Sequence, residues 1–271
     1  MRLIALLLAI LLPLPAMAAD TPAPETAYDR VMRTGILRCG YILVPPQLGK
    51  DPNTGQLSGL MVDVMNEIGK RLNLDIRWTE EVNFATMSSG LQTGRYDAIC
   101  FSLYRLPSAA KVMAYTRPLF YSATDIYVRS NDHRFDAQQT TRLNSPDISI
   151  ATIDAEMSAI IAQDSFPHAK TLSLPAGTDI TQLLLNVADG KADVTFVNRF
   201  IASGFLVANP GRVRNIEGTE PLRVFSHGIA YAPTEIALGQ MLNNAIDDMN
   251  EQGKLNELLT AHELLPETYM A

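Results

Sequence analysis

The chain has 271 residues, of which 47% are hydrophobic and 19% charged, and its formal net charge is −7. This composition is typical of a globular chain and excludes an intrinsically disordered one, and the length suffices for two domains of ordinary size. The acidic balance argues against nucleic acid and anionic membrane surfaces as partners.

Residues 1–19 are expected to form an export signal. Arg2 precedes an apolar run over residues 3–14, and the sequence Ala16-Met17-Ala18 has small residues where a signal peptidase requires them. The apolar run is too short for a transmembrane helix. No cysteine follows it, so a lipid anchor is not expected. We therefore expect a periplasmic protein.

Strands and helices alternate in the first part of the mature chain. Apolar residues recur every four positions over residues 60–72, which predicts an amphipathic helix, and a shorter helix is expected over 84–93. Apolar runs predict strands at 36–41, 74–78 and 97–101. Strands separated by helices favour a parallel sheet, so the fold class is α/β.

The same alternation begins again in the second half of the chain. We predict strands at 148–151, 171–172 and 193–197, with helices from about residue 155 and over 179–189. This pattern indicates a second α/β unit that is built like the first one.

Two further segments connect the units. Residues 125–129 and 228–231 each have the apolar character of an extended strand, and helices follow the second of them. The chain is thus expected to cross between two lobes twice, with lobe 1 formed by residues 28–125 plus 230–265 and lobe 2, with the hinge strands, by 126–229. The cleft between the lobes, at the carboxyl ends of the strands, is the expected ligand site.

Several short motifs follow one another in a fixed order. They lie at residues 35–40, 45–46, 59–64, 91–97, 115–118 and 189–193. In this order and spacing the chain resembles the periplasmic solute-binding proteins of family 3, which serve polar amino acid uptake in bacteria. The resemblance extends from residue 35 to about residue 265. It implies a two-lobed periplasmic binding protein of type II that closes on a small molecule and docks on a membrane permease of the ABC type.

The residues that would hold an amino acid's carboxylate in this family are changed. The resemblance implies an arginine twelve residues after Asp97, because a guanidinium fork matches the two oxygens of a carboxylate. That position is Ala109. The resemblance also implies free backbone amides at a helix start in lobe 2. Asp154 stands there, and as an N-cap it would occupy an amide and repel an anion.

The partner of the ligand's ammonium group is changed as well. Five residues after Asp193, where the resemblance implies an aspartate, the sequence has Asn198. We therefore predict that the ligand is not a standard α-amino acid. The candidate ligand-binding residues are Phe84, Ser102, Tyr104, Asn198, Asp154 and Ala109.

Other charged and reactive residues leave alternatives open. Arg105, Arg117 and Arg199 could line the cleft, or they could be solvated surface charges. Cys39 and Cys100 could form a disulfide in an oxidising compartment, or each could be buried as a free thiol. Neither cysteine has a second ligand at metal spacing, so neither a metal nor a cofactor is expected.

The sequence favours a binding protein over an enzyme. No nucleophile and base pair, phosphate-binding loop or pair of carboxylates stands at a catalytic spacing. The expected function is capture of a small molecule for uptake, by a monomer that works with a membrane permease. The alternatives are an accessory or signalling protein that acts with a membrane sensor or a partner enzyme, and a dehydratase-like enzyme.

Overall fold

The computed structural model describes residues 25–136, 140–216, 221–265 and 268–269, so the expected export signal lies outside the described residues. The helices are α1 (Ala27–Thr34), α2 (Leu60–Leu72), α3 (Met87–Gln92), α4 (Met157–Ser165), α5 (Thr181–Ala188), α6 (Arg199–Ala208), α7 (Ile236–Glu251) and α8 (Lys254–Ala261). The main strands are β1 (Ile36–Tyr41), β4 (Asp75–Glu81), β5 (Ala98–Tyr104), β7 (Phe120–Arg129), β8 (Ser149–Ile153), β9 (Lys170–Leu174), β10 (Val194–Asn198) and β12 (Arg223–Tyr231). Short strands are β2 (Gly49–Lys50), β3 (Leu57–Ser58), β6 (Ala114–Tyr115) and β11 (Val213–Asn215).

The main strands form one continuous sheet in the order β4-β1-β5-β12-β7-β10-β8-β9. Strand β1 is parallel to β4 and β5, and β8 is parallel to β9 and β10, as the alternation of strands and helices predicts. Strands β7 and β12 are antiparallel to their neighbours and pair with each other. The α/β class and the two parallel units are therefore confirmed.

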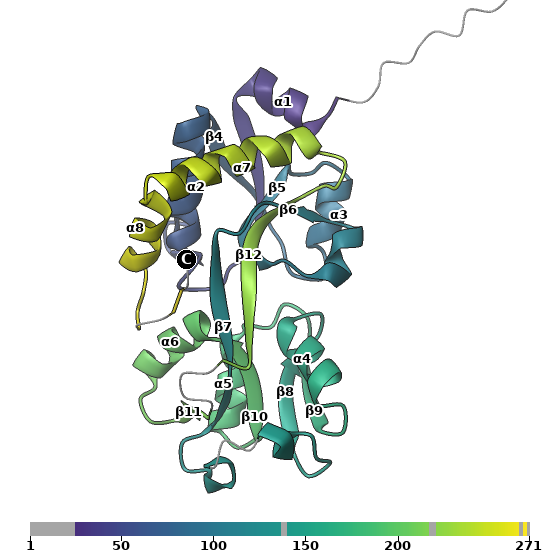
Figure 1. The fold of residues 1–271 in the computed structure, drawn as a ribbon, viewed down its shortest axis with the longest axis vertical. Helices are drawn as coiled ribbons and strands as arrows, with labels where there is room; N and C mark the ends of the chain where they lie inside the picture. The colour runs from purple at the N-terminus through teal and green to yellow at the C-terminus, as the bar shows by residue number, and fades with distance from the viewer. Residues whose placement is uncertain (1–24, 137–139, 217–220, 266–267, 270–271) are drawn as a thin grey trace, which may run out of the picture.

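The sheet joins two lobes (Figure 1). Helices α1, α2, α3, α7 and α8 surround β1, β4 and β5 in the first lobe, and α4, α5 and α6 surround β8, β9 and β10 in the second. Strands β7 and β12 run side by side from one lobe to the other. The predicted lobe boundaries at residues 125 and 229 fall inside these two strands. That the chain bends at residues 125 and 229 stays a prediction.

Helix α2 shows how the sequence builds lobe 1. Its apolar residues repeat on one face and are fully buried, namely Leu60, Met61, Val64, Met65 and Ile68. The helix begins after Gly59, whose φ of 114° favours glycine. A Cβ at Gly59 would lie 2.5 Å from the carbonyl oxygens of Pro46 and Gln47. This close approach holds the turn at residues 45–47 against the helix start.

A disulfide joins the two central strands of lobe 1. Cys39 in β1 and Cys100 in β5 are bonded, with their Cα atoms 5.3 Å apart. Of the two alternatives left open by the sequence, the structure therefore has the disulfide.

In the same lobe, the ring of Trp78 on β4 packs edge-on against Tyr41, with ring centroids 5.7 Å apart.

Two helices were not expected from the sequence. Helix α1 is capped by Thr26 and buries Val31, and α6 begins directly after Asn198. Helix α4 begins at Met157, about two residues later than predicted. In the part of the chain that the structure describes, no helix is long and apolar enough to cross a membrane.

Candidate ligand pocket between the lobes

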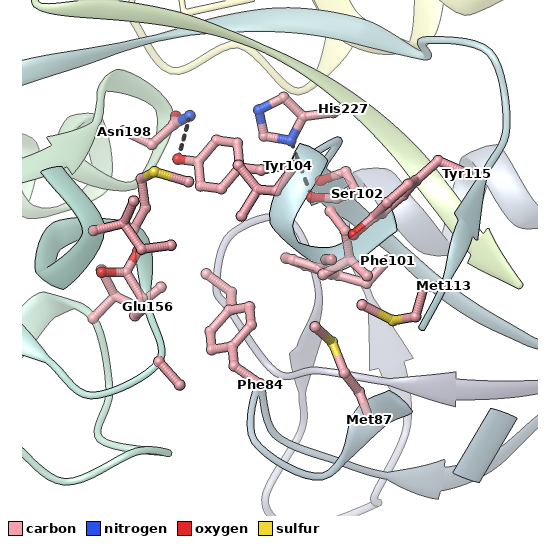
Figure 2. Close-up of a pocket in the computed structure, with 18 of the residues that line it drawn as sticks. Phe84, Met87, Phe101, Ser102, Tyr104, Met113, Tyr115, Glu156, Asn198 and His227 are labelled. Atoms are coloured by element: carbon pink, nitrogen blue, oxygen red, sulfur yellow. Dashed lines mark hydrogen bonds between the residues drawn. The ribbon is translucent and has the colours of Figure 1, made fainter. Parts of the chain in front are cut away.

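A cavity of about 290 Å³ lies between the lobes, where the sequence predicts a ligand site (Figure 2). Lobe 1 contributes the end of β5, the turn at 107–111 and residues around α3. Lobe 2 contributes the starts of α4 and α6, and β12 contributes His227. A solute in this cavity would contact both lobes at once, which is how a hinged protein couples binding to closure.

Five of the six candidate residues line the cavity. They are Phe84, Ser102, Tyr104, Ala109 and Asn198. The sixth, Asp154, is exposed, does not line the cavity, and accepts a hydrogen bond from the Ser173 hydroxyl. Contacts with a ligand stay a prediction for the five residues, and the structure places Asp154 away from the pocket.

The prediction that Asp154 caps helix α4 is wrong, because Glu156 is the N-cap. Its carboxylate accepts hydrogen bonds from the backbone N–H of Ser158 at 2.7 Å and from the Ser158 hydroxyl at 2.5 Å. Ala155 has a φ of 62°, in the left-handed region, and this turn delays the start of the helix. The acidic side chain at this helix start that lines the cavity is therefore that of Glu156, which is 8% exposed.

Asn198 joins the two lobes through hydrogen bonds. It is the last residue of β10 and the N-cap of α6, where its Oδ1 accepts from the backbone N–H of Phe200 at 2.8 Å. Its Nδ2 donates to the Tyr104 hydroxyl of lobe 1 at 3.2 Å and to the hydroxyl of Ser122. These bonds occupy both ends of the amide.

A buried histidine continues this network along the cavity wall. Nδ1 of His227 lies 3.0 Å from the carbonyl oxygen of Ser102, which can only accept, so Nδ1 carries the proton. Nε2 then accepts from the Ser122 hydroxyl at 2.6 Å. The Ser102 hydroxyl donates to Oε1 of Gln47 at 2.7 Å. The polar groups of this wall are thus largely paired with one another.

The three arginines that could line the cleft lie elsewhere. Arg105 is exposed, and the guanidinium of Arg117 pairs with Asp247 on the surface of lobe 1. Arg199 pairs with the buried Asp125 on β7 through two bonds of 2.8 and 3.0 Å. No arginine or lysine is found among the described residues that line the cavity.

The environment of His227 predicts a pH dependence of stability. Burial lowers the pKa of His227 from 6.5 to about 4, so the ring is neutral in the folded state at neutral pH. The stability that this provides is present above pH 6.5 and is lost as the pH falls toward 4, by on the order of 3 kcal/mol. We expect His227→Gln to lower the free energy of unfolding at neutral pH and to reduce its loss toward pH 4.

Urea unfolding of both proteins at neutral pH and near pH 4 measures this difference. The variant removes the titrating group, so the two free energies of unfolding should converge at acid pH. If the loss of stability toward acid were the same with and without His227, another group would be responsible for it.

Several polar residues of the pocket were not among the candidates, and Glu156, His227 and Gln47 are three of them. Glu156 lies two positions after the candidate Asp154, and His227 lies on the second crossing strand, far along the chain from the other candidates. Gln47 directly follows the motif at residues 45–46, and this position could have indicated that it lines the pocket. No group of three or more His, Cys, Asp or Glu side chains within the described ranges is placed to hold a metal ion.

Solved structures with the same architecture show which fold this is. An ancestral amino acid-binding protein, described as a precursor of cyclohexadienyl dehydratase, matches with a TM-score of 0.77 at 21% identity, over 88% of this chain and 99% of its own. A putative binding component of an ABC transporter from Wolinella succinogenes, complexed with lysine, matches with a TM-score of 0.74 at 18% identity, over 84% and 96%. The fold is that of a two-lobed periplasmic binding protein of type II.

The family follows from the sequence itself. The family model described as bacterial extracellular solute-binding proteins, family 3, matches residues 37–262. The chain therefore belongs to the family 3 bacterial extracellular solute-binding proteins. A probable histidine-binding protein of Campylobacter jejuni is 22% identical over 77% of this chain and 78% of its own length. An L-arginine-binding protein of Pseudomonas aeruginosa is 24% identical over 87% and 88%.

Proposed function

We propose that the chain is exported to the periplasm, where as a monomer it captures a small molecule between its lobes and delivers it to an ABC-type permease. Membership of the extracellular solute-binding family supports this role. The similar structure described as a putative binding component of an ABC transporter supports transport as the purpose of binding. The cavity that is lined from both lobes is the capture site.

The ligand in this proposal is not a standard α-amino acid, and one observation carries this point. The described lining of the cavity includes no arginine or lysine, while it includes the buried carboxyl group of Glu156. Burying an α-carboxylate without a cation costs several kcal/mol, and a second carboxyl group nearby adds repulsion. The names of the relatives favour an amino acid instead, so the two expectations can be separated by experiment.

We favour a binding protein over a dehydratase because the pocket is poorly suited to bind a substrate that carries carboxylates. A dehydratase substrate of the prephenate type carries carboxylates, which would meet the same lack of a cation. His227, the imidazole in the wall, is buried and has both nitrogens engaged by Ser102 and Ser122. The network therefore holds the wall together and does not present a free base to the cavity.

A ligand screen with a blocked pocket tests the proposal. Purified mature protein is screened by thermal shift against a broad metabolite panel that contains the common amino acids, and hits are confirmed by calorimetry. A ligand that binds only the folded state must raise the melting temperature. We expect at least one hit outside the amino acids, and we expect Ala109→Trp to abolish its binding because the indole fills the cavity.

The matched control is Ala110→Trp. Ala110 is the next residue in the same turn, but it is exposed and does not line the cavity, so this variant should bind like the wild type. Micromolar binding of a common α-amino acid would contradict the proposed ligand class. Equal binding by the two tryptophan variants would contradict the assignment of the pocket.

A further inference from the structure

We propose that the solute is a compact organic cation, with an apolar or aromatic body, one amine and no carboxylate, and that its ammonium group pairs with Glu156. This inference rests on the proposed function of the pocket and adds the charge and shape of the ligand. It is carried by the position of one buried carboxyl group, by the side chains opposite it, and by the charges at the adjoining surface.

Glu156 is held in place and faces the cavity. It lines the pocket and is 8% exposed, and both hydrogen bonds from Ser158 end on its Oε2. The backbone N–H of Met157 gives it further support. A carboxylate offers about four lone-pair positions, so these bonds leave room for another donor. A donor that enters from the cavity can therefore bind Glu156 without breaking the helix cap.

No cation of the described lining balances this carboxyl group. Lysine and arginine are absent from that lining, and His227 is neutral at neutral pH because burial lowers its pKa to about 4. Burial also raises the pKa of Glu156, while the hydrogen bonds from Ser158 and Met157 oppose this effect. An ammonium group would supply the missing partner, and its charge-assisted hydrogen bond would be stronger than a neutral one.

The opposite wall suits an apolar body. Figure 2 shows Glu156 on one side of the pocket and Phe101, Met87 and Met113 on the other, with Phe84 between them. Aromatic faces and thioether groups attract aromatic rings and cations. A cavity of about 290 Å³ has the space of about ten water molecules, which fits a molecule of similar size. Such a ligand would contact both lobes at once.

The surface beside the pocket is acidic, like Glu156 inside it. A second cavity of about 390 Å³ adjoins the pocket and shares Phe84 with it. Its acidic side chains are Glu81 and Asp179, and no lysine or arginine is found among its described lining residues. Lys50 lies 3.3 Å from Glu81 and balances part of this charge. A cation that approaches this part of the surface is therefore attracted, and an anion is repelled.

A matched set of probes tests the inference on the wild-type protein. The probes are 2-phenylethylamine, 2-phenylethanol, 3-phenylpropionate and phenylalanine, which share one ring and differ in charge. We expect calorimetry to show the tightest binding for 2-phenylethylamine, by at least about tenfold over 3-phenylpropionate and phenylalanine, because only the amine pairs with Glu156 without adding a carboxylate.

Two variants then assign the preference to one residue. Glu156→Gln removes the charge and keeps the size, so it should lower the affinity for 2-phenylethylamine about tenfold or more and leave 2-phenylethanol nearly unchanged. Asp154→Asn is the matched control, because Asp154 is exposed and lies outside the pocket. It should leave both affinities unchanged. Thermal unfolding without ligand checks that each variant is folded.

The wild-type series decides the matter even if Glu156→Gln does not fold. Equal or tighter binding of 3-phenylpropionate or phenylalanine would overturn the inference, and so would a failure of 2-phenylethylamine to bind. Binding of 3-phenylpropionate, or a failure of 2-phenylethylamine to bind, would leave the proposed function standing. Micromolar binding of phenylalanine would contradict the proposed ligand class as well, and capture in this pocket fails only if blocking the pocket has no effect.

Discussion

Replacing Cys39 and Cys100 together by alanine is expected to lower the free energy of unfolding by about 4 kcal/mol. The disulfide joins residues that are 61 positions apart, so its loss frees a long loop in the unfolded chain. Both cysteines are fully buried, and alanine avoids placing a polar group there. For a chain of this size, such a loss corresponds to a melting temperature lower by about 8–16 °C.

Equilibrium unfolding in urea, with and without a reducing agent, measures this effect. The wild type in reducing agent should approach the stability of the double variant, and the double variant should not respond to the reducing agent. A loss below about 1 kcal/mol on removing both cysteines would contradict the constraint that we assign to the disulfide.

The second large effect is expected at Asp97, where Asp97→Ala should lower the free energy of unfolding by about 3–5 kcal/mol. The carboxylate is buried, accepts from the backbone N–H of Arg38 at 2.9 Å, and pairs with the guanidinium groups of Arg30 and Arg38. Both arginine side chains are partly buried, with 21% and 26% of their surface exposed. Without Asp97 the two guanidinium groups would lose the carboxylate that they share.

A surface ion pair provides the control for this measurement. Asp189 pairs with Arg212 at 2.7 Å, and both side chains are almost half exposed. Asp189→Ala should therefore cost less than about 1 kcal/mol, because solvent screens the pair. If chemical denaturation gave similar losses for the two aspartate variants, burial would not be the reason for the importance of Asp97.

The fold could be predicted from the sequence because its signals are local. Apolar periodicity indicated α2, and apolar runs between helices indicated the strands of both lobes. The same local spacing placed Asn198 at the end of β10, where the structure has it. Helix α6 was missed because it follows Asn198 without a loop, so no turn segment separates the helix from the strand.

The site was harder to predict, because its contacts depend on distant segments and on single dihedral angles. Asp154 and Glu156 are both acidic residues near a helix start, and the φ of 62° at Ala155 decides which of them caps α4. His227 reaches Ser102 across 125 positions of sequence, through the pairing of β12 with β5. Neither the dihedral angle nor the pairing leaves a signal in a single sequence.

Trp78 determines how ligand binding can be observed. It is the only tryptophan of the chain, and it packs on Tyr41 in the sheet of lobe 1 and does not line the ligand pocket. Its fluorescence is therefore expected to report unfolding of lobe 1 and to remain unchanged when a solute fills the pocket. Unchanged tryptophan emission during a titration would therefore not show that no ligand has bound. Calorimetry and the melting temperature report binding without depending on Trp78.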